Sequence, residues 1–202
     1  MKKAVLIFSQ QWADFSLGVH HPMQPERIQH AYNLMKAYRL LSRDAVSTLE
    51  PTPATEDDLA LCHSTEYIQI VRSLSEGDTV EAPWRWGLGT ADNPVVPGMY
   101  DVAALSVGAT MCAADLILDG EADVAFNLGG GFHHAHHARA AGFCLFNDLA
   151  VAIAHILRKT SKDAKVAYVD IDAHHGDGVQ EAFYDSDRVL TISLHESGRF
   201  LY

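Results

Sequence analysis

Apolar and polar residues along this chain fall into two kinds of segment. Short, continuous apolar runs bounded by turn residues predict four buried strands, at residues 4–8, 124–128, 165–172 and 189–194. Apolar residues three and four positions apart predict helices, at residues 25–41, 64–74, 97–118 and 147–159, with a further short helix opening after Thr55. Because strands and helices alternate, the pattern predicts βαβ units around a mostly parallel sheet.

Two loops, at residues 18–25 and 77–97, separate these elements. The second is rich in Gly, Pro and Trp, and a loop of this length inside a compact domain is usually functional. No change of composition marks a linker, so we expect a single α/β domain over residues 1–202.

The chain is acidic, with a formal net charge of −11. This balance argues against direct nucleic-acid binding, which needs a basic face, and is compatible with basic substrates. The cysteines lack CxxC spacing and are interpreted as free thiols of a reducing compartment: Cys62, Cys112 and Cys144. The first apolar run is too short for a signal peptide and no run reaches membrane-spanning length. We therefore expect a cytoplasmic protein that does not bind membranes.

The densest chemistry follows the strand predicted at residues 165–172. Asp170, Asp172 and His174 are spaced by two, so an extended segment would project them to one side. Carboxylate and imidazole ligands suit Zn²⁺ and also Fe²⁺, and a catalytic zinc needs three protein ligands plus an open position for water. Asp172 and His174 are the predicted ligands because they lie nearest the loop. Asp170, which lies deeper, is predicted to orient a histidine.

A histidine pair, His133 and His134, follows three glycines after the strand at residues 124–128. Beside a metal-bound water, one histidine can act as general base and another as general acid. Each needs a partner that holds its tautomer, and Asp170 and Asp177 are the predicted partners. The remaining histidines, among them the neighbouring His136 and His137, are interpreted as ordinary loop or core residues.

Three motifs in the same order along the chain, at residues 129–135, 142–148 and 168–179, resemble the zinc-dependent histone deacetylase family. Within that family the chain most resembles the bacterial acetoin-utilisation branch, and the segments 21–27 and 92–94 fit the same pattern. The resemblance implies a three-layer α/β/α fold with a mostly parallel sheet, the arginase/deacetylase fold, incomplete at the C-terminus. It also implies hydrolysis of acetyl-lysine amides in a protein or peptide substrate.

The resemblance implies a role for each matching position. His133 and His134 match the tandem catalytic histidines, paired with Asp170 and Asp177, while Asp172 and His174 match two zinc ligands. Other matches are the rim aspartate that grips the substrate backbone (Asp92), the wall of the acyl-lysine tunnel (Gly142 and Phe143) and the arginine of an acetate channel (Arg27). Two structural potassium sites are also implied, one at Asp170, Asp172, His174, Ser193 and Leu194 and another that includes Phe183, Ser186 and Val189.

Arginase-like relatives hold two Mn²⁺ with Asp-x-His-x-Asp, but here Gly176 stands where the second carboxylate would be. One metal and amide hydrolysis are therefore the better interpretation. In the family the third zinc ligand and a carbonyl-polarising tyrosine lie further downstream, and Tyr202 does not fit that tyrosine. We therefore expect the N-terminal part of a longer deacetylase, whose late strands insert beside the strand carrying Asp170, and no activity of the 202-residue chain alone. An acetylpolyamine amidohydrolase and a non-catalytic deacetylase-like protein remain alternatives, and the oligomeric state stays open.

Overall fold

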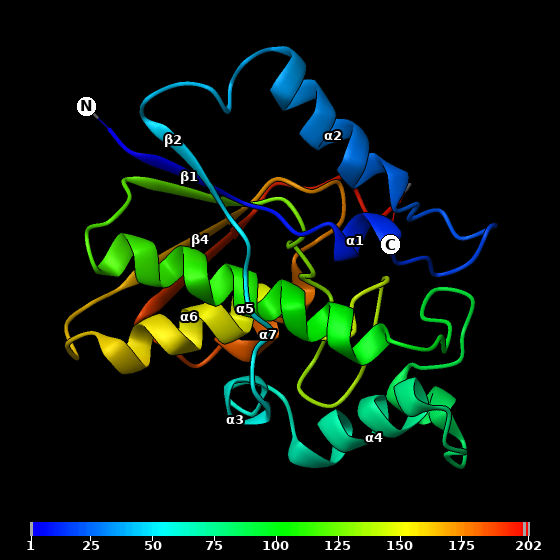
Figure 1. Cartoon of the computed structure of the whole chain (residues 1–202). Coiled ribbons are helices and arrows are strands. Elements are labelled where there is room, and N and C mark those ends of the chain that lie inside the picture. Colours follow the sequence, from blue (N-terminus) through cyan, green and yellow to red (C-terminus); the bar gives the residue numbers. More distant parts are fainter. Residues whose placement is uncertain (1, 200, 202) are drawn as a thin grey trace.

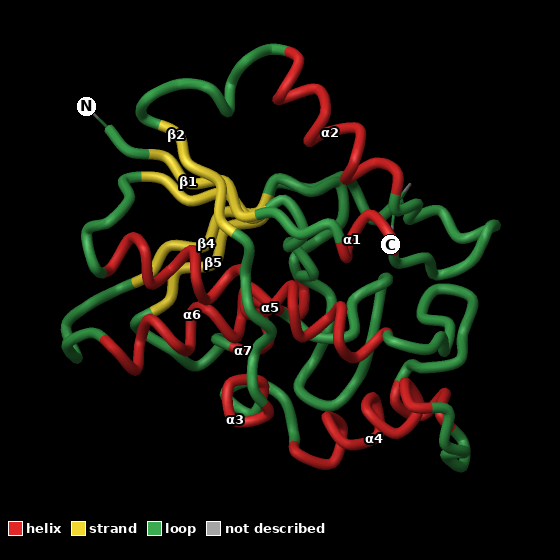
Figure 2. Tube along the Cα trace, in the orientation of Figure 1, coloured by secondary structure: helices red, strands yellow, loops and turns green. Residues whose placement is uncertain are grey.

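The computed structural model describes residues 2–199 and 201 of the chain, which form parallel strands covered by helices (Figures 1 and 2). The strands are β1 (Ala4–Ile7), β2 (Val46–Leu49), β3 (Val124–Asn127), β4 (Val166–Asp170) and β5 (Val189–Ser193). The helices are α1 (Gln11–Asp14), α2 (Glu26–Ala37), α3 (Glu56–Leu59), α4 (Thr65–Glu76), α5 (Met99–Leu118), α6 (Asp148–Lys159) and α7 (Asp177–Ala182), with a 3₁₀ turn η1 (Pro83–Trp86).

All strand pairings are parallel. Three strands form one sheet in the order β2-β1-β3, and β4 pairs with β5 in a second. Helix α2 covers one face of the first sheet, where Tyr32 stacks on Phe8 with ring centroids 3.9 Å apart. Helix α5 covers the other face and packs on α6 (Figure 1). The predicted α/β/α layering with a mostly parallel sheet is therefore confirmed.

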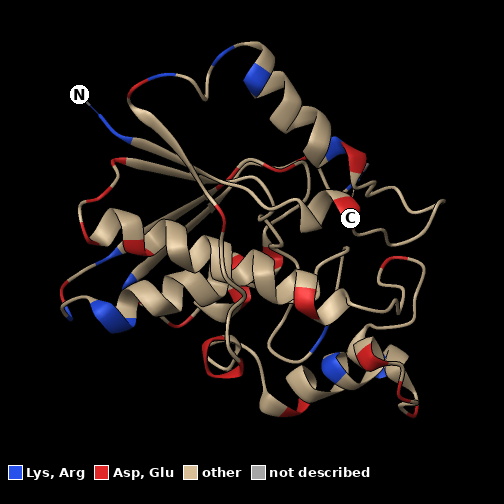
Figure 3. Ribbon diagram, in the orientation of Figure 1, with Lys and Arg blue, Asp and Glu red and all other residues tan. Residues whose placement is uncertain are grey.

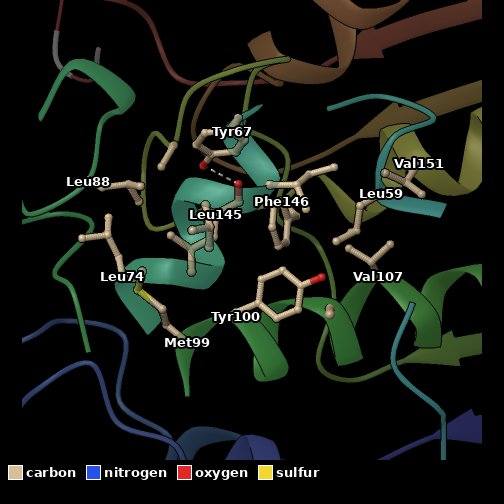
Figure 4. Close-up of a cluster of buried hydrophobic side chains, with 14 of the residues drawn as sticks. Leu59, Tyr67, Leu74, Leu88, Met99, Tyr100, Val107, Leu145, Phe146 and Val151 are labelled. Carbon is tan, nitrogen blue, oxygen red and sulfur yellow. Dashed lines mark hydrogen bonds between the residues drawn. The ribbon is translucent and has the colours of Figure 1, made fainter. Parts of the chain in front are cut away.

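Helix α5 is the centre of the core. By length and apolar composition it could cross a membrane, so the expectation that no run reaches that length was wrong. Here it packs against α6, β3 and α4, as an internal helix of a globular fold does. Its apolar residues join a buried cluster with α4 and the segment before α6 (Figure 4). Within this cluster the hydroxyl of Tyr67 donates to the carbonyl of Leu145 over 2.7 Å, which ties α4 to the loop that leads into α6.

Several predicted boundaries differ from the structure. Helix α2 ends at Ala37, because Arg39 adopts a positive φ of 55° that a helix cannot continue through. Strand β4 ends at Asp170, so the prediction that it continues to Asp172 was wrong. The sequence pattern also did not predict β2, whose middle residues Ser47 and Thr48 are polar and exposed. Nor did it predict α7, which is short and contains Gly178.

The carboxyl ends of the strands lie on one side, where the segments that follow β3 and β4 meet. Acidic residues are spread over many of the helices and loops, whereas basic residues are fewer (Figure 3). The strand ends therefore position the predicted histidine and aspartate motifs as the parallel topology requires.

Candidate active site

The loop that carries the histidine pair is held by buried hydrogen bonds to the start of α6. The carboxylate of Asp148, which is fully buried, accepts hydrogen bonds from the backbone amide of Phe132 at 2.7 Å and from that of Gly131 at 3.1 Å. Burial raises the pKa of Asp148, while the hydroxyl of Thr110 and these backbone amides oppose that rise. Removing this carboxylate would leave the loop's amides without their acceptor.

The other side of the loop is held by Asn147, the N-cap of α6. Its side-chain amide donates to the carbonyl of His133 at 3.1 Å and to that of Ala135 at 3.0 Å. Gly178 of α7 lies against the same carbonyls, and a Cβ there would come within 2.5 Å of the His133 oxygen. The close approach of α7 to the histidine loop therefore requires glycine at this position.

His133 forms a buried pair with Asp170 at the end of β4. Its Nδ1 lies 2.6 Å from Oδ2 of Asp170, and both side chains are less than a tenth exposed. The hydroxyl of Tyr168 donates to the same oxygen. Burial raises the pKa of Asp170, but hydrogen bonds from Tyr168, His133 and the amide of Asp172 outweigh it and hold this pKa below its usual value. A carboxylate at Nδ1 leaves Nε2 of His133 as the nitrogen that faces the site.

His134 forms a second, more exposed pair with Asp177 at the start of α7. Nδ1 of His134 lies 2.6 Å from Oδ1 of Asp177, whose side chain is 44% exposed. Burial raises the pKa of Asp177, but the hydrogen bond and charge of His134 outweigh it, so that this pKa is lowered. The imidazole of His134 packs on Gly142, where a Cβ would come within 2.4 Å of the ring. Both predicted histidine–aspartate pairs are therefore present in the structure.

Asp172 and His174 lie together in the irregular segment after β4. Nδ1 of His174 is 2.8 Å from Oδ1 of Asp172, and Nε2 of His133 is 4.0 Å from the same oxygen. Burial raises the pKa of Asp172, and hydrogen bonds from His174 outweigh it and lower this pKa. Because β4 ends at Asp170, a turn of the chain brings the side chains of Asp172 and His174 together. The sequence had instead predicted that the alternation of side chains along a strand would do so.

The donor set of this segment fits part of a zinc site. One carboxylate oxygen and one imidazole nitrogen converge, and these are zinc-type donors. Within residues 2–199 and 201, however, no group of three or more His, Cys, Asp or Glu side chains is arranged to hold a metal ion. Asp172 and His174 therefore offer two of the three protein ligands that a catalytic zinc needs.

The predicted substrate-contacting residues lie beside the histidine pair. The ring of Phe143 meets that of His21 edge-on with centroids 4.6 Å apart, and Nε2 of His21 lies 3.1 Å from the carbonyl oxygen of Asp92. Phe143, Asp92 and Arg27 all line one mainly apolar cavity of about 70 Å³. Residues 23–25 and 27, 92–94 and 143, which come from three segments far apart in the sequence, therefore surround one cavity.

The residues implied for potassium binding also form two groups. Ser193 pairs with Asp170 between β5 and β4, and the amide of Leu194 donates to the Asp170 carbonyl at 2.9 Å. In the second group, the Ser186 amide donates to the Phe183 carbonyl at 3.0 Å, and Phe183 packs against the buried cluster that contains Val189. Potassium binding itself stays a prediction, and Tyr202 lies outside the described residues.

Sequence reasoning missed several residues that build the site. Asp148 carries no signal on its own, because its partners in the histidine loop lie 16 and 17 positions away. Tyr168 lies only two residues before its partner Asp170, but a tyrosine in a strand gives no sign that its hydroxyl contacts that carboxylate. His63 is a third case: its Nδ1 lies 3.0 Å from the His136 carbonyl and its Nε2 accepts from the Asn147 amide. Burial lowers the pKa of His63 to about 4, so this histidine is a neutral structural link. His137 is exposed, as expected for a loop histidine, but His136 contacts α7.

Comparison with known proteins gives a consistent result. Residues 21–202 match the histone deacetylase domain family. The chain is 43% identical to the acetoin utilization protein AcuC of Bacillus subtilis, over the whole chain and 51% of that protein. It is 36% identical to histone deacetylase Clr6 of Schizosaccharomyces pombe, over 98% of this chain and 48% of that protein. The chain thus spans about half the length of these curated relatives.

The solved structures agree. The crystal structure of a histone deacetylase homologue from Aquifex aeolicus superimposes with a TM-score of 0.87 and 33% identity, over the whole of this chain and 53% of that one. A structure of a histone deacetylase homologue complexed with SAHA matches equally well. The fold is therefore the arginase/deacetylase fold, present in part.

Proposed function

Because the chain belongs to the histone deacetylase family, we propose that it supplies most of the active site of a zinc-dependent lysine deacetylase. The observation that carries this proposal is the convergence of two histidine–aspartate pairs on the Asp172–His174 segment. The rings of His133 and His134 lie 4.0 Å apart, and that of His134 lies 5.6 Å from His174. Folding alone does not require three imidazoles to meet in the segments that follow β3 and β4.

Asp172 and His174 would hold the zinc. When bound, zinc supplies Lewis-acid polarisation of the acetyl-lysine carbonyl and lowers the pKa of a coordinated water. The same two ligands would also accept Fe²⁺, so metal identity is part of the test.

The two histidines would have different roles in proton transfer. Each has its Nδ1 against a carboxylate, which leaves each Nε2 free to accept or give a proton. We assign general base and then general acid to His134. The more buried His133, close to Asp172, provides electrostatic stabilisation or acts as a first base. Asp170 and Asp177 stabilise the imidazolium forms without becoming protonated, as the aspartate of a catalytic triad does.

Residues around the cavity would position the substrate. Gly142 packs against the His134 ring, and the next residue, Phe143, meets His21, so an acyl-lysine chain passing these residues would reach the histidines. Asp92 would accept hydrogen bonds from the substrate backbone, and Arg27, on the wall of the same cavity, would face the released acetate. These roles follow the family resemblance of each position.

The remaining ligand and the carbonyl-polarising tyrosine would come from a further part of the protein. Within the described part of the chain, β3 and β4 each pair with a strand on one side only. Exposed apolar side chains mark these strands, including Phe126 at 49%, Val169 at 56% and Ile171, just after β4, at 80%. Exposed apolar strand edges of this kind are normally paired with further strands or covered by other elements. We infer that these strands carry the missing groups, and that the 202-residue chain alone binds zinc weakly and does not turn over.

The test joins this chain to the part of the AcuC relative that follows the matched region; we call the product the complemented enzyme. It is loaded with Zn²⁺ or with Fe²⁺, and acetate release from an acetyl-lysine peptide is measured beside the chain alone. We expect turnover by the complemented enzyme only, and His174→Ala should abolish both stoichiometric metal binding and turnover. His137→Gln is the matched control, because this exposed side chain hydrogen-bonds to the Cys62 carbonyl, away from Asp172 and His174.

Two outcomes would contradict the proposal. One is full turnover by His174→Ala, which would remove this residue from the metal site. The other is hydrolysis of an acetylated polyamine with no hydrolysis of the peptide, which would assign a different substrate class.

A further inference from the structure

A hydrogen-bond network joins the central helix α5 to the loop that carries the histidine pair. The hydroxyl of Thr110, near the middle of α5, donates to Oδ2 of Asp148 over 2.5 Å. The oxygen of the same hydroxyl accepts a hydrogen bond from Nδ2 of Asn127, the last residue of β3, at 2.8 Å. Asp148 in turn accepts from the backbone amides of Gly131 and Phe132. The network therefore runs from β3 through α5 to the start of α6 and the histidine loop.

The direction of the hydrogen bonds around Thr110 follows from their lengths and charges. A hydroxyl has one proton, and two acceptors lie near this one: the carboxylate of Asp148 at 2.5 Å and the carbonyl of Ser106 at 3.3 Å. The carboxylate is both the nearer and the charged acceptor, so it takes the proton. The Thr110 oxygen is then free to accept from Asn127, whose Oδ1 accepts from the amide of Gly129 at 2.9 Å. Thr110 therefore links the side chain at the end of β3 to the carboxylate that holds the loop.

Asp148 depends strongly on each of its donors because it is fully buried. In the described part of the chain, the donors that reach it from other residues are the Thr110 hydroxyl and the amides of Gly131 and Phe132. These donors are neutral, and a donor lost from a buried carboxylate costs more than one lost at the surface. The hydroxyl is the donor that comes from outside the loop. It therefore determines where the carboxylate lies relative to the core helix.

The packing of Gly130 shows how closely the histidine loop lies on this network. A Cβ at this position would lie 2.6 Å from Nδ2 of Asn127 and from Oδ2 of Asp148, and 3.0 Å from the Thr110 hydroxyl. The loop therefore passes directly over the three side chains, and only glycine leaves room for that contact. Two residues separate Gly130 from His133, so a displacement of the network would move the imidazole of His133.

We propose that Thr110 is a positioning residue, which fixes the histidine loop, and with it the imidazoles of His133 and His134, through the carboxylate of Asp148. The inference rests on the proposed function for its effect on turnover, but not for its effect on the loop. A displaced imidazole still allows the substrate to bind but misses the geometry that proton transfer requires. Loss of the hydroxyl should therefore lower kcat and leave KM unchanged.

The experiment compares three threonine substitutions. Thr110→Val keeps the branched shape and removes the hydroxyl, Thr110→Ser keeps the hydroxyl, and Thr160→Val is the matched control. The Thr160 hydroxyl donates to the carbonyl four residues earlier, that of Ile156, at 2.8 Å, and it lies at the opposite end of α6 from Asp148. In the complemented enzyme, we expect Thr110→Val to lower kcat about tenfold with KM unchanged. Thr110→Ser and Thr160→Val should keep the wild-type kcat.

A second measurement on the same protein needs no turnover. Hydrogen exchange, followed by mass spectrometry over residues 129–133, reports the hydrogen bonds that the amides of Gly131 and Phe132 donate to Asp148. Thr110→Val should speed exchange in this segment about tenfold, the size expected when a buried carboxylate loses one donor. Thr110→Ser should restore slow exchange. Helix α4, which lies outside the network, should exchange at the wild-type rate in every variant.

Three outcomes would overturn the inference. One is wild-type exchange of the loop in Thr110→Val. Another is an equal loss of kcat in Thr110→Ser and Thr110→Val, which would assign the effect to packing of the side chain and not to its hydroxyl. The third is equally faster exchange in the loop and in α4, which would indicate a general loss of stability. Faster exchange confined to the loop, with no turnover by the wild type or any variant, would count against the proposed function alone.

Discussion

The two histidine–aspartate pairs are chemically alike but lie in different surroundings. The side chain of Asp170 is 7% exposed and accepts from Tyr168 as well as His133, whereas that of Asp177 is 44% exposed and faces His136 as well as His134. One carboxylate is locked between two donors at a strand end. The other lies on a short helix with a titratable neighbour.

This difference indicates what each pair is suited to do. A buried carboxylate with a permanent hydroxyl donor keeps its orientation and charge over a wide pH range, so His133 suits a constant electrostatic role. A half-exposed carboxylate that water can reach holds its imidazole less rigidly, so His134 suits the residue that accepts and returns protons. Because His133 and His134 are neighbours in one loop, the two pairs differ mainly in the surroundings of their aspartates.

Asp170→Asn should have the largest effect on activity. The amide would reverse the hydrogen-bond polarity at Nδ1 of His133 and leave Tyr168 and the Asp172 amide with a poorer acceptor. We expect kcat/KM of the complemented enzyme to fall about 10⁴-fold, by analogy with the same substitution of the aspartate in a catalytic triad. Asp115→Asn is the matched control, since Asp115 also pairs with a histidine, His155, but away from the site. A loss below tenfold would mean that His133 is not held through Asp170.

Asp148→Asn should disturb both pairs at once. The amide places a donor group against the backbone amides of Gly131 and Phe132, which now bind a buried carboxylate. We expect the free energy of unfolding to fall by about 2–4 kcal/mol, measured by urea denaturation. The exposed Asp163→Asn provides the control. Equal stability of the two variants would show that the histidine loop is held by other contacts.

Asp177→Asn should cost less than Asp170→Asn. Water can reach this pair and replace part of the lost interaction, and partners of this kind typically contribute 10–100-fold. We therefore expect kcat/KM of the complemented enzyme to fall about 10–100-fold, with the loss in kcat rather than in KM because Asp177 does not contact the substrate. If Asp177→Asn proved more damaging than Asp170→Asn, the assignment of roles to the two histidines would be reversed.

Much of this arrangement could be predicted from the sequence. Apolar runs located β1, β3, β4 and β5, and helical spacing located the four longer helices, because buried elements leave a periodic pattern. Parallel topology then requires the segments after β3 and β4 to meet, which brings His133 and His134 to the aspartates.

The rest depends on contacts that leave no local pattern. Strand β2 has polar residues at its centre because it is an edge strand, and α7 is too short to show periodicity. The contact of Asp148 with the histidine loop and that of His136 with Glu181 join residues 16 and 45 positions apart. Single histidines and aspartates are more often solvated than paired, so only the fold reveals these partners.

The two histidine–aspartate pairs should also differ in how much they make the stability of the fold depend on pH, although this difference is smaller than the differences in activity. The pKa values of Asp170 and Asp177 are both lowered, so each carboxylate contributes stability that is present above its unfolded pKa, near 4, and is lost as the pH falls through the folded value. We expect the urea midpoint of the wild type to decrease on acidification below about pH 5. Asp170→Asn should flatten that decrease more than Asp177→Asn, because solvent screens the exposed pair. Equal flattening by both variants would show that the difference in burial does not determine how strongly each pair stabilises the fold.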